Sequence, residues 1–159
     1  LPLVVGQALT DKQHSVSCAE SCTGGLVTSM LTDIPGSSDY VLGSIVAYSN
    51  AVKQQLVGVR AESLLQHGAV SETVALEMAQ GVRQLFQTTY GVGITGIAGP
   101  GGATPEKPVG LVYLAVAGPE GATCVYRHQF TGSRQDIKYR TAMMALAHLF
   151  DVLRGTEQK

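Results

Sequence analysis

The chain has 159 residues, of which 45% are hydrophobic and 14% charged, so it is long and apolar enough for a single domain with a sizeable core. Its net charge is −1 and its basic residues are scattered, which argues against a nucleic-acid partner. Three cysteines without a CxxC pair argue against both a disulfide framework and a zinc site, and they favour a reducing cytoplasm.

A membrane partner is not expected either. No apolar run approaches the roughly 18 to 20 residues that span a bilayer, and the N-terminus lacks the pattern of a signal peptide. The first residue is Leu1 rather than Met, so a few leading residues are expected to precede it.

Hydrophobic periodicity, helix caps and Gly/Pro turns divide the chain into helices and strands. Helices are expected over about 3–10, 24–32, 51–57, 61–66, from Ser71 onward with Val74, Met78, Val82 and Leu85 on one face, and over 134–153. Strands are expected over about 14–19, 40–48, 90–98, 109–117 and 122–130, with the last two forming a hairpin and 40–48 largely buried.

This alternation predicts an α/β fold, a three-layer α/β/α sandwich around a mixed, mostly parallel sheet of about five strands with an antiparallel member. Ligands bind such sheets at the carboxyl ends of the strands. Three strand exits should therefore meet at one edge, namely 21–25, 48–53 and 97–107, of which the last is a long Gly/Pro loop.

The most informative stretch runs from His14 to Gly25, where a short strand leads into the start of a helix. Ser21, Cys22 and Thr23 crowd this turn, and two glycines follow them. A helix N-terminus carries free N–H groups and a partial positive charge, so it can hold a phosphate or a developing oxyanion. The simpler interpretation is that one of these hydroxyl groups is an ordinary N-cap.

Nucleophilic catalysis would need a partner that activates one of these side chains. Lys53 or Tyr48 could do so, because a desolvated lysine loses its proton near neutral pH and serves as a base toward a serine. The alternatives are a solvated helix lysine and a tyrosine with a wet hydroxyl group. Cys22 stays a second candidate nucleophile, because a helix start lowers the pKa of a thiol.

Several other patterns are set aside. The glycines at 91, 93 and 96 spell GxGxxG but lie inside a predicted strand, so a dinucleotide site is rejected. A P-loop motif is absent, and the four histidines show neither a metal-ligand spacing nor a triad. Arg134, Lys138 and Arg140 open the final helix, either as surface charges or as a clamp for a phosphate or carboxylate.

Five ordered motifs carry a resemblance to a known family over residues 3 to 153. They are Ala19-Glu-Ser-Cys-Thr-Gly-Gly25, Tyr48-Ser-Asn50 with Lys53, His67-Gly-Ala-Val-Ser71, Thr95-Gly-Ile-Ala-Gly-Pro100 and Lys107-Pro-Val-Gly110. Together they resemble the C-terminal domain of the competence/damage-inducible protein CinA, whose stand-alone form is the nicotinamide-mononucleotide deamidase. The larger N-terminal module that many members carry has no counterpart here, so a short form or an excised piece is expected.

The resemblance implies a bacterial enzyme that hydrolyses the carboxamide of nicotinamide mononucleotide to nicotinate mononucleotide and ammonia, without a metal or organic cofactor. It implies Ser21 as nucleophile, Lys53 as base and Tyr48 as its assistant. It further implies nucleotide contacts from a set of backbone and side-chain groups, namely Thr23, Gly24, Gly25, Thr95, Gly96, Ala98, Gly99, and Arg134 or Arg140 for the phosphate.

Two other functions stay open, a non-catalytic nucleotide-binding or interaction module and a hydrolase of another small amide. The final helix is apolar on two sides, with Ala142, Met143, Leu146, Phe150 and Leu153 beside Ile137, Met144, Ala145 and Leu149. A helix that is apolar nearly all round must be buried, so a homo-oligomer is expected.

Overall fold

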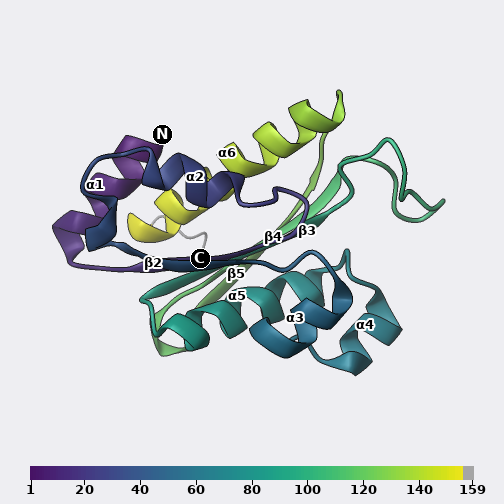
Figure 1. The fold of residues 1–159 in the computed structure, drawn as a ribbon, viewed down its shortest axis with the longest axis horizontal. Helices are drawn as coiled ribbons and strands as arrows, with labels where there is room; N and C mark the ends of the chain where they lie inside the picture. The colour runs from purple at the N-terminus through teal and green to yellow at the C-terminus, as the bar shows by residue number, and fades with distance from the viewer. Residues whose placement is uncertain (156–159) are drawn as a thin grey trace.

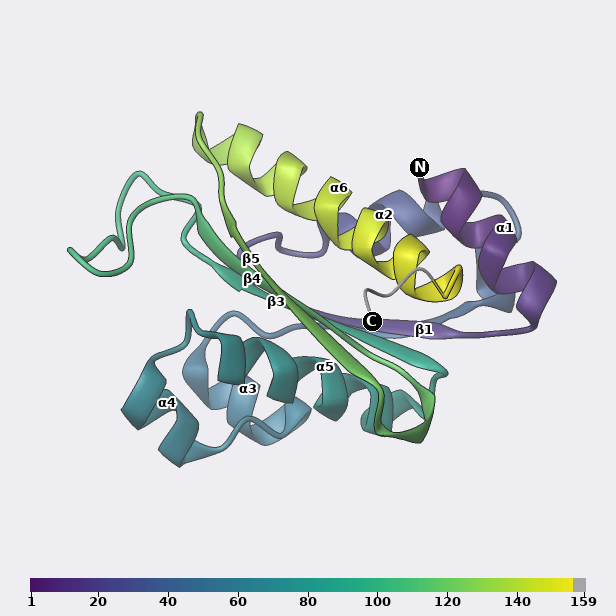
Figure 2. The ribbon, with the colours of Figure 1, turned by 180° about the vertical axis from the view of Figure 1, so that it is seen from behind.

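The computed structural model describes residues 1–155 as three layers, with one sheet between two layers of helices (Figures 1 and 2). Residues 156–159 of the expected domain 1–159 lie outside the described residues. The helices are α1 (Pro2–Lys12), α2 (Leu26–Thr32), α3 (Asn50–Val57), α4 (Ala61–His67), α5 (Glu72–Phe86) and α6 (Arg134–Leu153). The strands are β1 (Val16–Glu20), β2 (Val41–Val46), β3 (Tyr90–Gly96), β4 (Leu111–Ala117) and β5 (Thr123–Gln129).

The sheet has five strands in the order β2-β1-β3-β4-β5. Strand β1 pairs in parallel with β2 and β3, and β4 pairs antiparallel with both β3 and β5. Four strands therefore run in one direction and β4 alone runs against them, which confirms the predicted mixed, mostly parallel sheet.

Each face of the sheet is covered by its own set of helices. Helices α1, α2 and α6 lie on one face and α3, α4 and α5 on the other (Figure 1). The larger apolar cluster joins β1, β3 and β4 to α1, α2 and α6, and a second one joins α3 and α5 to β1. Residues on both apolar sides of α6 are therefore at least partly buried against other elements of the same chain. The homo-oligomer stays a prediction.

Glycines in β3 let α5 lie unusually close to the sheet. A Cβ atom on Gly91 would come within 2.1 Å of the Ala79 carbonyl oxygen, and one on Gly93 within 2.2 Å of the Ala75 carbonyl oxygen. Such distances exclude any side chain, since packed interiors leave no room for an extra methyl group. The GxGxxG pattern is therefore a packing feature of a strand, in agreement with its rejection as a dinucleotide site.

Two expectations about burial were wrong. The strand predicted over 40–48 is the edge strand β2, where Leu42 and Val46 are 51% and 48% exposed. Its β-branched and aromatic composition does not distinguish an edge from a centre, because the strand's neighbours decide burial. Leu85 of α5 is 49% exposed, while Val74, Met78 and Val82 are buried as expected. None of the helices within residues 1–155 is both long and apolar enough to cross a bilayer.

A histidine pair joins β5 to α6 and should make stability depend on pH. The Nε2 atoms of His128 and His148 lie 2.7 Å apart, and His148 stacks on Tyr126. Burial, followed by the charge of His128 and partly offset by that of Asp151, lowers the pKa of His148 to about 4; burial also lowers the pKa of His128.

Acidification is expected to destabilise the fold through this pair. Histidine side chains of the unfolded chain bind protons near pH 6.5, whereas the folded pair stays neutral at that pH because the pKa of both side chains is lowered. The free energy of unfolding therefore falls by up to about 3 kcal/mol as the pH drops from about 7 toward about 4. Urea unfolding across this range measures the effect. The pH slope should be smaller in His148→Gln, and an unchanged slope in that variant would contradict this assignment.

Candidate active site

The turn after β1 is held by a buried carboxylate. Glu20 is fully buried, and its Oε1 accepts hydrogen bonds from Thr23 Oγ1 at 2.7 Å and Val27 N at 2.9 Å. Its Oε2 accepts from both the backbone N and the hydroxyl group of Thr28, at 3.0 and 2.7 Å. Glu20 thus caps the start of α2, where a negative charge is favoured. This network fixes the turn on which Ser21 sits.

Ser21 leaves the sheet at the carboxyl end of β1. Its backbone N–H donates to the Ile94 carbonyl oxygen of β3 at 3.1 Å, and the residue is 8% exposed. On the other side of β1, β2 leads into α3, whose N-cap Ser49 accepts a hydrogen bond from Val52 N. The first turn of α3 then brings Lys53 back over the end of the sheet.

The amine of Lys53 meets the hydroxyl group of Ser21, as expected from the convergence of strand ends. Lys53 Nζ donates to Ser21 Oγ at 3.1 Å, to the Ala47 carbonyl oxygen at 2.8 Å and to the Tyr48 carbonyl oxygen at 3.1 Å. The residue is only 2% exposed. The described residues place no carboxylate within ion-pair distance of it.

Burial sets the protonation behaviour of this lysine. Desolvation lowers the pKa of Lys53, with a smaller opposing effect from Cys22. A neutral amine has two hydrogens and one lone pair. Because the two carbonyl groups can only accept, they would take both hydrogens, and the lone pair would then face Ser21 Oγ. The site is therefore built so that a deprotonated Lys53 can accept the proton of Ser21.

Cys22 lies beside Ser21 in a different electrostatic state. Burial raises the pKa of its thiol to about 12, an effect strengthened by the charge of Glu20 and opposed by its own backbone N–H, by Lys53 and by Lys138. A thiol that stays protonated at neutral pH is a poor nucleophile. The geometry therefore favours Ser21 over Cys22.

A cavity of about 270 Å³ opens in front of the pair. Its lining includes Ser21, Cys22, Tyr48, Asn50, Lys53, Ala69, Val70, residues 95–99, Gly101, Gly102 and Arg134. Lys53 and Arg134 are the basic residues of this lining, no acidic residue belongs to it, and Arg134 keeps its charge whether or not Lys53 is protonated. An electrically positive pocket of this kind suits an anionic ligand.

Arg134 closes one side of this cavity. It donates from Nη1 to the Gly99 carbonyl oxygen at 2.7 Å and from Nη2 to Tyr48 Oη at 3.0 Å. Ser133 and Asp136 form a capping box at the start of α6, which fixes the position of the arginine. Tyr48 contacts Lys53 through its backbone carbonyl group, and its hydroxyl group binds Arg134 instead.

Four predicted contact residues do not line this cavity. Thr23 is 1% exposed and its hydroxyl group is used by Glu20, and Gly24 donates its N–H to the Ser21 carbonyl oxygen. Gly25 precedes α2 outside the lining, and Arg140 donates to the Thr131 carbonyl oxygen. Thr23 is thus turned toward the carboxylate that caps α2, and Arg140 lies on another face of α6 than Arg134. A cap of this kind leaves the helix start unable to receive an oxyanion there.

Several lining residues are not among the site residues predicted from the sequence, among them Asn50, Ala69, Val70, Gly101 and Gly102. Thr95 Oγ1 donates to the Ala69 carbonyl oxygen at 2.8 Å and so ties the loop of Ala69 and Val70 to the end of β3. The sequence signals for this loop are its place between a helix-ending glycine and the N-cap Ser71, and its membership of the motif His67-Gly-Ala-Val-Ser71.

The fold and this site define an α/β protein with a buried serine–lysine pair at the carboxyl edge of a mixed sheet. The family model of the CinA C-terminal domain matches residues 1–153, and the chain belongs to this family. A CinA-like protein of Gloeothece citriformis is 52% identical over an alignment of 152 residues that covers 94% of this chain and 36% of the relative. One of Thermotoga maritima is 45% identical over 155 residues, 98% of this chain and 38% of the relative.

Solved structures agree with the fold. A competence/damage-inducible protein from Agrobacterium tumefaciens has a TM-score of 0.91 and 39% identity, covering 96% of this chain and 94% of that one. A CinA superfamily protein from Klebsiella pneumoniae has a TM-score of 0.93 and 30% identity, covering 97% and 96%. The chain thus spans little more than a third of the length of the two curated relatives, and nearly the whole length of the two solved chains.

Proposed function

We propose that this chain is an amidohydrolase that converts nicotinamide mononucleotide and water into nicotinate mononucleotide and ammonia. The observation that carries the proposal is the buried amine of Lys53, held by two carbonyl oxygens and directed at Ser21 Oγ. A buried lysine without a carboxylate partner is costly to fold. Its placement beside a serine in a cavity favours a chemical role.

The first half of the reaction forms an ester on Ser21. Neutral Lys53 accepts the proton of Ser21 as Oγ attacks the carbonyl carbon of the carboxamide, which becomes tetrahedral. The protonated amine then gives this proton to the leaving nitrogen. The C–N bond breaks, ammonia departs, and the nicotinoyl group stays bound to Oγ.

The second half restores the enzyme. Lys53, neutral again, accepts a proton from water as the water oxygen attacks the ester carbonyl carbon, and it returns the proton to Ser21 Oγ as the C–O bond breaks. The oxyanion of both steps needs donors other than the capped start of α2. Ala98 and Gly99 line the cavity, and their backbone N–H groups have no acceptor within residues 1–155, so we assign these groups to this task. One such donor contributes roughly 3 to 4 kcal/mol.

The same cavity has a cation for the substrate phosphate. Each terminal nitrogen of Arg134 carries a second hydrogen beyond those given to Gly99 and Tyr48. These hydrogens can form the paired contacts with phosphate oxygens that a guanidinium group favours.

Loss of this guanidinium group is expected to weaken substrate binding. Arg134→Gln should raise KM for nicotinamide mononucleotide by about tenfold to a hundredfold, the value of a charge-assisted hydrogen bond, with a smaller change in kcat. Arg140→Gln removes an equal charge outside the cavity and serves as the control. Steady-state kinetics of both variants decide the assignment, and equal KM values for Arg134→Gln and the wild type would contradict it.

Incubation of the chain with nicotinamide mononucleotide, with ammonia measured by a coupled assay and binding by calorimetry, tests the function itself. Ammonia release supports the hydrolase. Saturable binding without ammonia supports the alternative, a nucleotide-binding module of a CinA-type protein. A panel of small amides, including the dephosphorylated nucleoside, shows whether another amide is the better substrate.

A further inference from the structure

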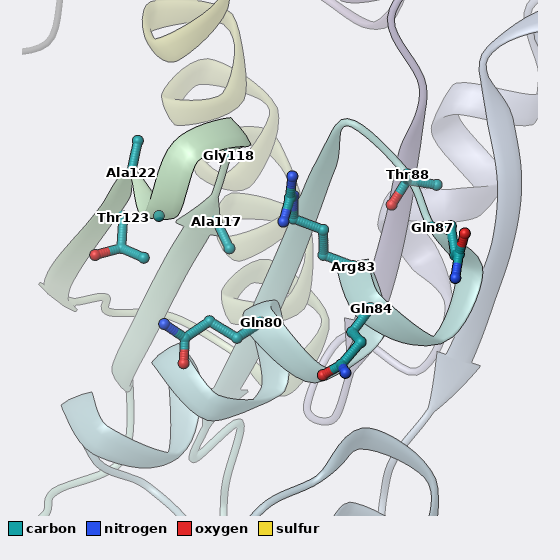
Figure 3. A pocket seen from close by; sticks show the side chains of 10 residues that line it. Gln80, Arg83, Gln84, Gln87, Thr88, Ala117, Gly118, Ala122 and Thr123 are labelled. Atoms are coloured by element: carbon teal, nitrogen blue, oxygen red, sulfur yellow. The ribbon is translucent and has the colours of Figure 1, made fainter.

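A second and larger cavity lies at the other end of the strands from Ser21, near the start of β3. It has a volume of about 480 Å³ and lies between the second half of α5 and the turn that joins β4 to β5 (Figure 3). This volume falls within the range of roughly 300 to 1,000 Å³ that small-molecule sites occupy. The lining comes from α5 and its C-terminal turn and from the β4–β5 turn.

Arg83 is the charged residue of this lining, and no acidic residue belongs to it. Its Nε donates to the Thr89 carbonyl oxygen at 2.9 Å, which fixes the plane of the guanidinium group. Within residues 1–155 no carboxylate lies at ion-pair distance from Arg83, and no hydrogen-bond acceptor meets its two terminal nitrogens. These nitrogens form a prearranged fork, and holding them in place beforehand lowers the entropy lost on binding.

Neutral polar groups surround the guanidinium group. The side chain of Arg83 extends from α5 toward Gly118, while Gln80 extends toward the strand that carries Thr123 (Figure 3). The amide of Gln80 can both donate and accept, and so can the hydroxyl group of Thr123. Thr88 is different, because its hydroxyl group already binds the Tyr90 carbonyl oxygen at 2.8 Å and Ser17 Oγ at 2.7 Å.

The end of α5 carries only a partial negative charge, roughly half a unit, against the full positive charge of Arg83. Carbonyl groups at a helix C-terminus carry partial negative charge and would repel an anion. Here the Arg83 carbonyl oxygen accepts hydrogen bonds from the backbone N–H groups of Gln87 and Thr88, so it is satisfied. The single full charge at the cavity is therefore that of the Arg83 guanidinium group.

We propose that this cavity, defined by Arg83, Gln80 and Thr123, is a second binding site for a small polar metabolite that carries one carboxylate or phosphate group. Arg83 pairs with the anionic group through its two terminal nitrogens, and Gln80 and Thr123 hydrogen-bond to the rest of the molecule. The site is separated from Ser21 by the length of β3. It is independent of the hydrolase chemistry.

The proposal can be tested by NMR titration of the full, 15N-labelled chain with inorganic phosphate and, separately, with acetate at constant ionic strength. Saturable shifts are expected at the amides of Thr88, Gly118 and Thr123. Saturation by phosphate alone, by acetate alone or by both supports the site and identifies the anionic group that it prefers. Linear, non-saturating shifts with both probes would overturn the proposal.

Variants separate this site from the cavity at Ser21. Arg83→Gln should weaken binding at the second site at least about tenfold, while shifts at Gly99 and Gly102 stay as in the wild type. Arg127→Gln makes an equal charge change at an exposed position of β5. It should leave the shifts at both cavities as they are in the wild type.

Loss of Arg83 also removes the bond to Thr89, so two further variants protect the test against a folding defect. Arg83→Lys keeps the charge without the fork and should bind with intermediate affinity. Ala122→Trp leaves Arg83 in place and fills the cavity from an exposed turn, so it should abolish the shifts at Gly118 and Thr123. Wild-type affinity in folded Arg83→Gln or in Ala122→Trp would refute the assignment.

Discussion

Replacing Ser21 with Ala is expected to lower kcat for nicotinamide mononucleotide by about 10⁴-fold or more, the scale seen when a nucleophile is deleted. The change removes one oxygen from a residue that is 8% exposed, and the backbone bond from Ser21 N to Ile94 is unaffected. The fold and the affinity for the nucleotide should therefore persist. Ammonia release and calorimetric binding, measured on the same preparation, show whether chemistry alone is lost.

Cys22→Ala is the matched control for this change, because it removes one atom of similar size from the neighbouring residue of the same cavity. Its thiol has a pKa raised to about 12 and stays protonated. We expect kcat within about threefold of the wild type, since no step passes through the sulfur. Loss of turnover in Cys22→Ala together with retention in Ser21→Ala would move the nucleophile from serine to cysteine.

Replacing Lys53 with Met is expected to lower kcat by about 10³-fold, within the range of roughly 10² to 10⁴ that a general base contributes. Met keeps much of the length and the apolar stem of the lysine but cannot accept a proton. Lys12→Met makes the same substitution at a lysine on the exposed end of α1 and should leave the rate unchanged. Ammonia release by the two variants, with thermal unfolding as a check on folding, provides the comparison.

The pH dependence of the wild type tests the same role independently. Burial lowers the pKa of Lys53, and a base acts only when it is deprotonated. The value of kcat/KM should therefore rise with pH through this lowered pKa, at a pH below the ordinary lysine value of about 10.4. A rate that instead falls as the lysine deprotonates would show that the ammonium form is the active one.

Much of the fold follows from local signals in the sequence. Ser133 and Asp136 predict the start of α6, and Ser71 predicts that of α5, because a capping side chain satisfies backbone N–H groups within the next turn. The meeting of Ser21 and Lys53 follows from a rule about where parallel strands end. These inferences need only residues close in sequence and a general property of the fold.

The remaining features depend on contacts between residues that are distant in sequence, or on which of two similar residues lies toward the cavity. That β2 lies at an edge, with Leu42 and Val46 exposed, is set by strand order. In the sequence, Glu20 is one strand residue among others. In the fold, its carboxylate accepts hydrogen bonds from the hydroxyl group of Thr23 and from two N–H groups in the first turn of α2. Arg134 and Arg140 lie on different faces of α6. Arg134 contacts Gly99 in the cavity, whereas Arg140 contacts Thr131 outside it.

The most direct test of the serine–lysine mechanism is a rapid quench of the wild-type chain during turnover of nicotinamide mononucleotide, followed by mass-spectrometric peptide mapping. The mechanism predicts a mass increase equal to the substrate less ammonia, located on the peptide that contains Ser21 and assigned to its hydroxyl group. An adduct on Cys22, or on any other side chain, during turnover at the full rate would contradict it.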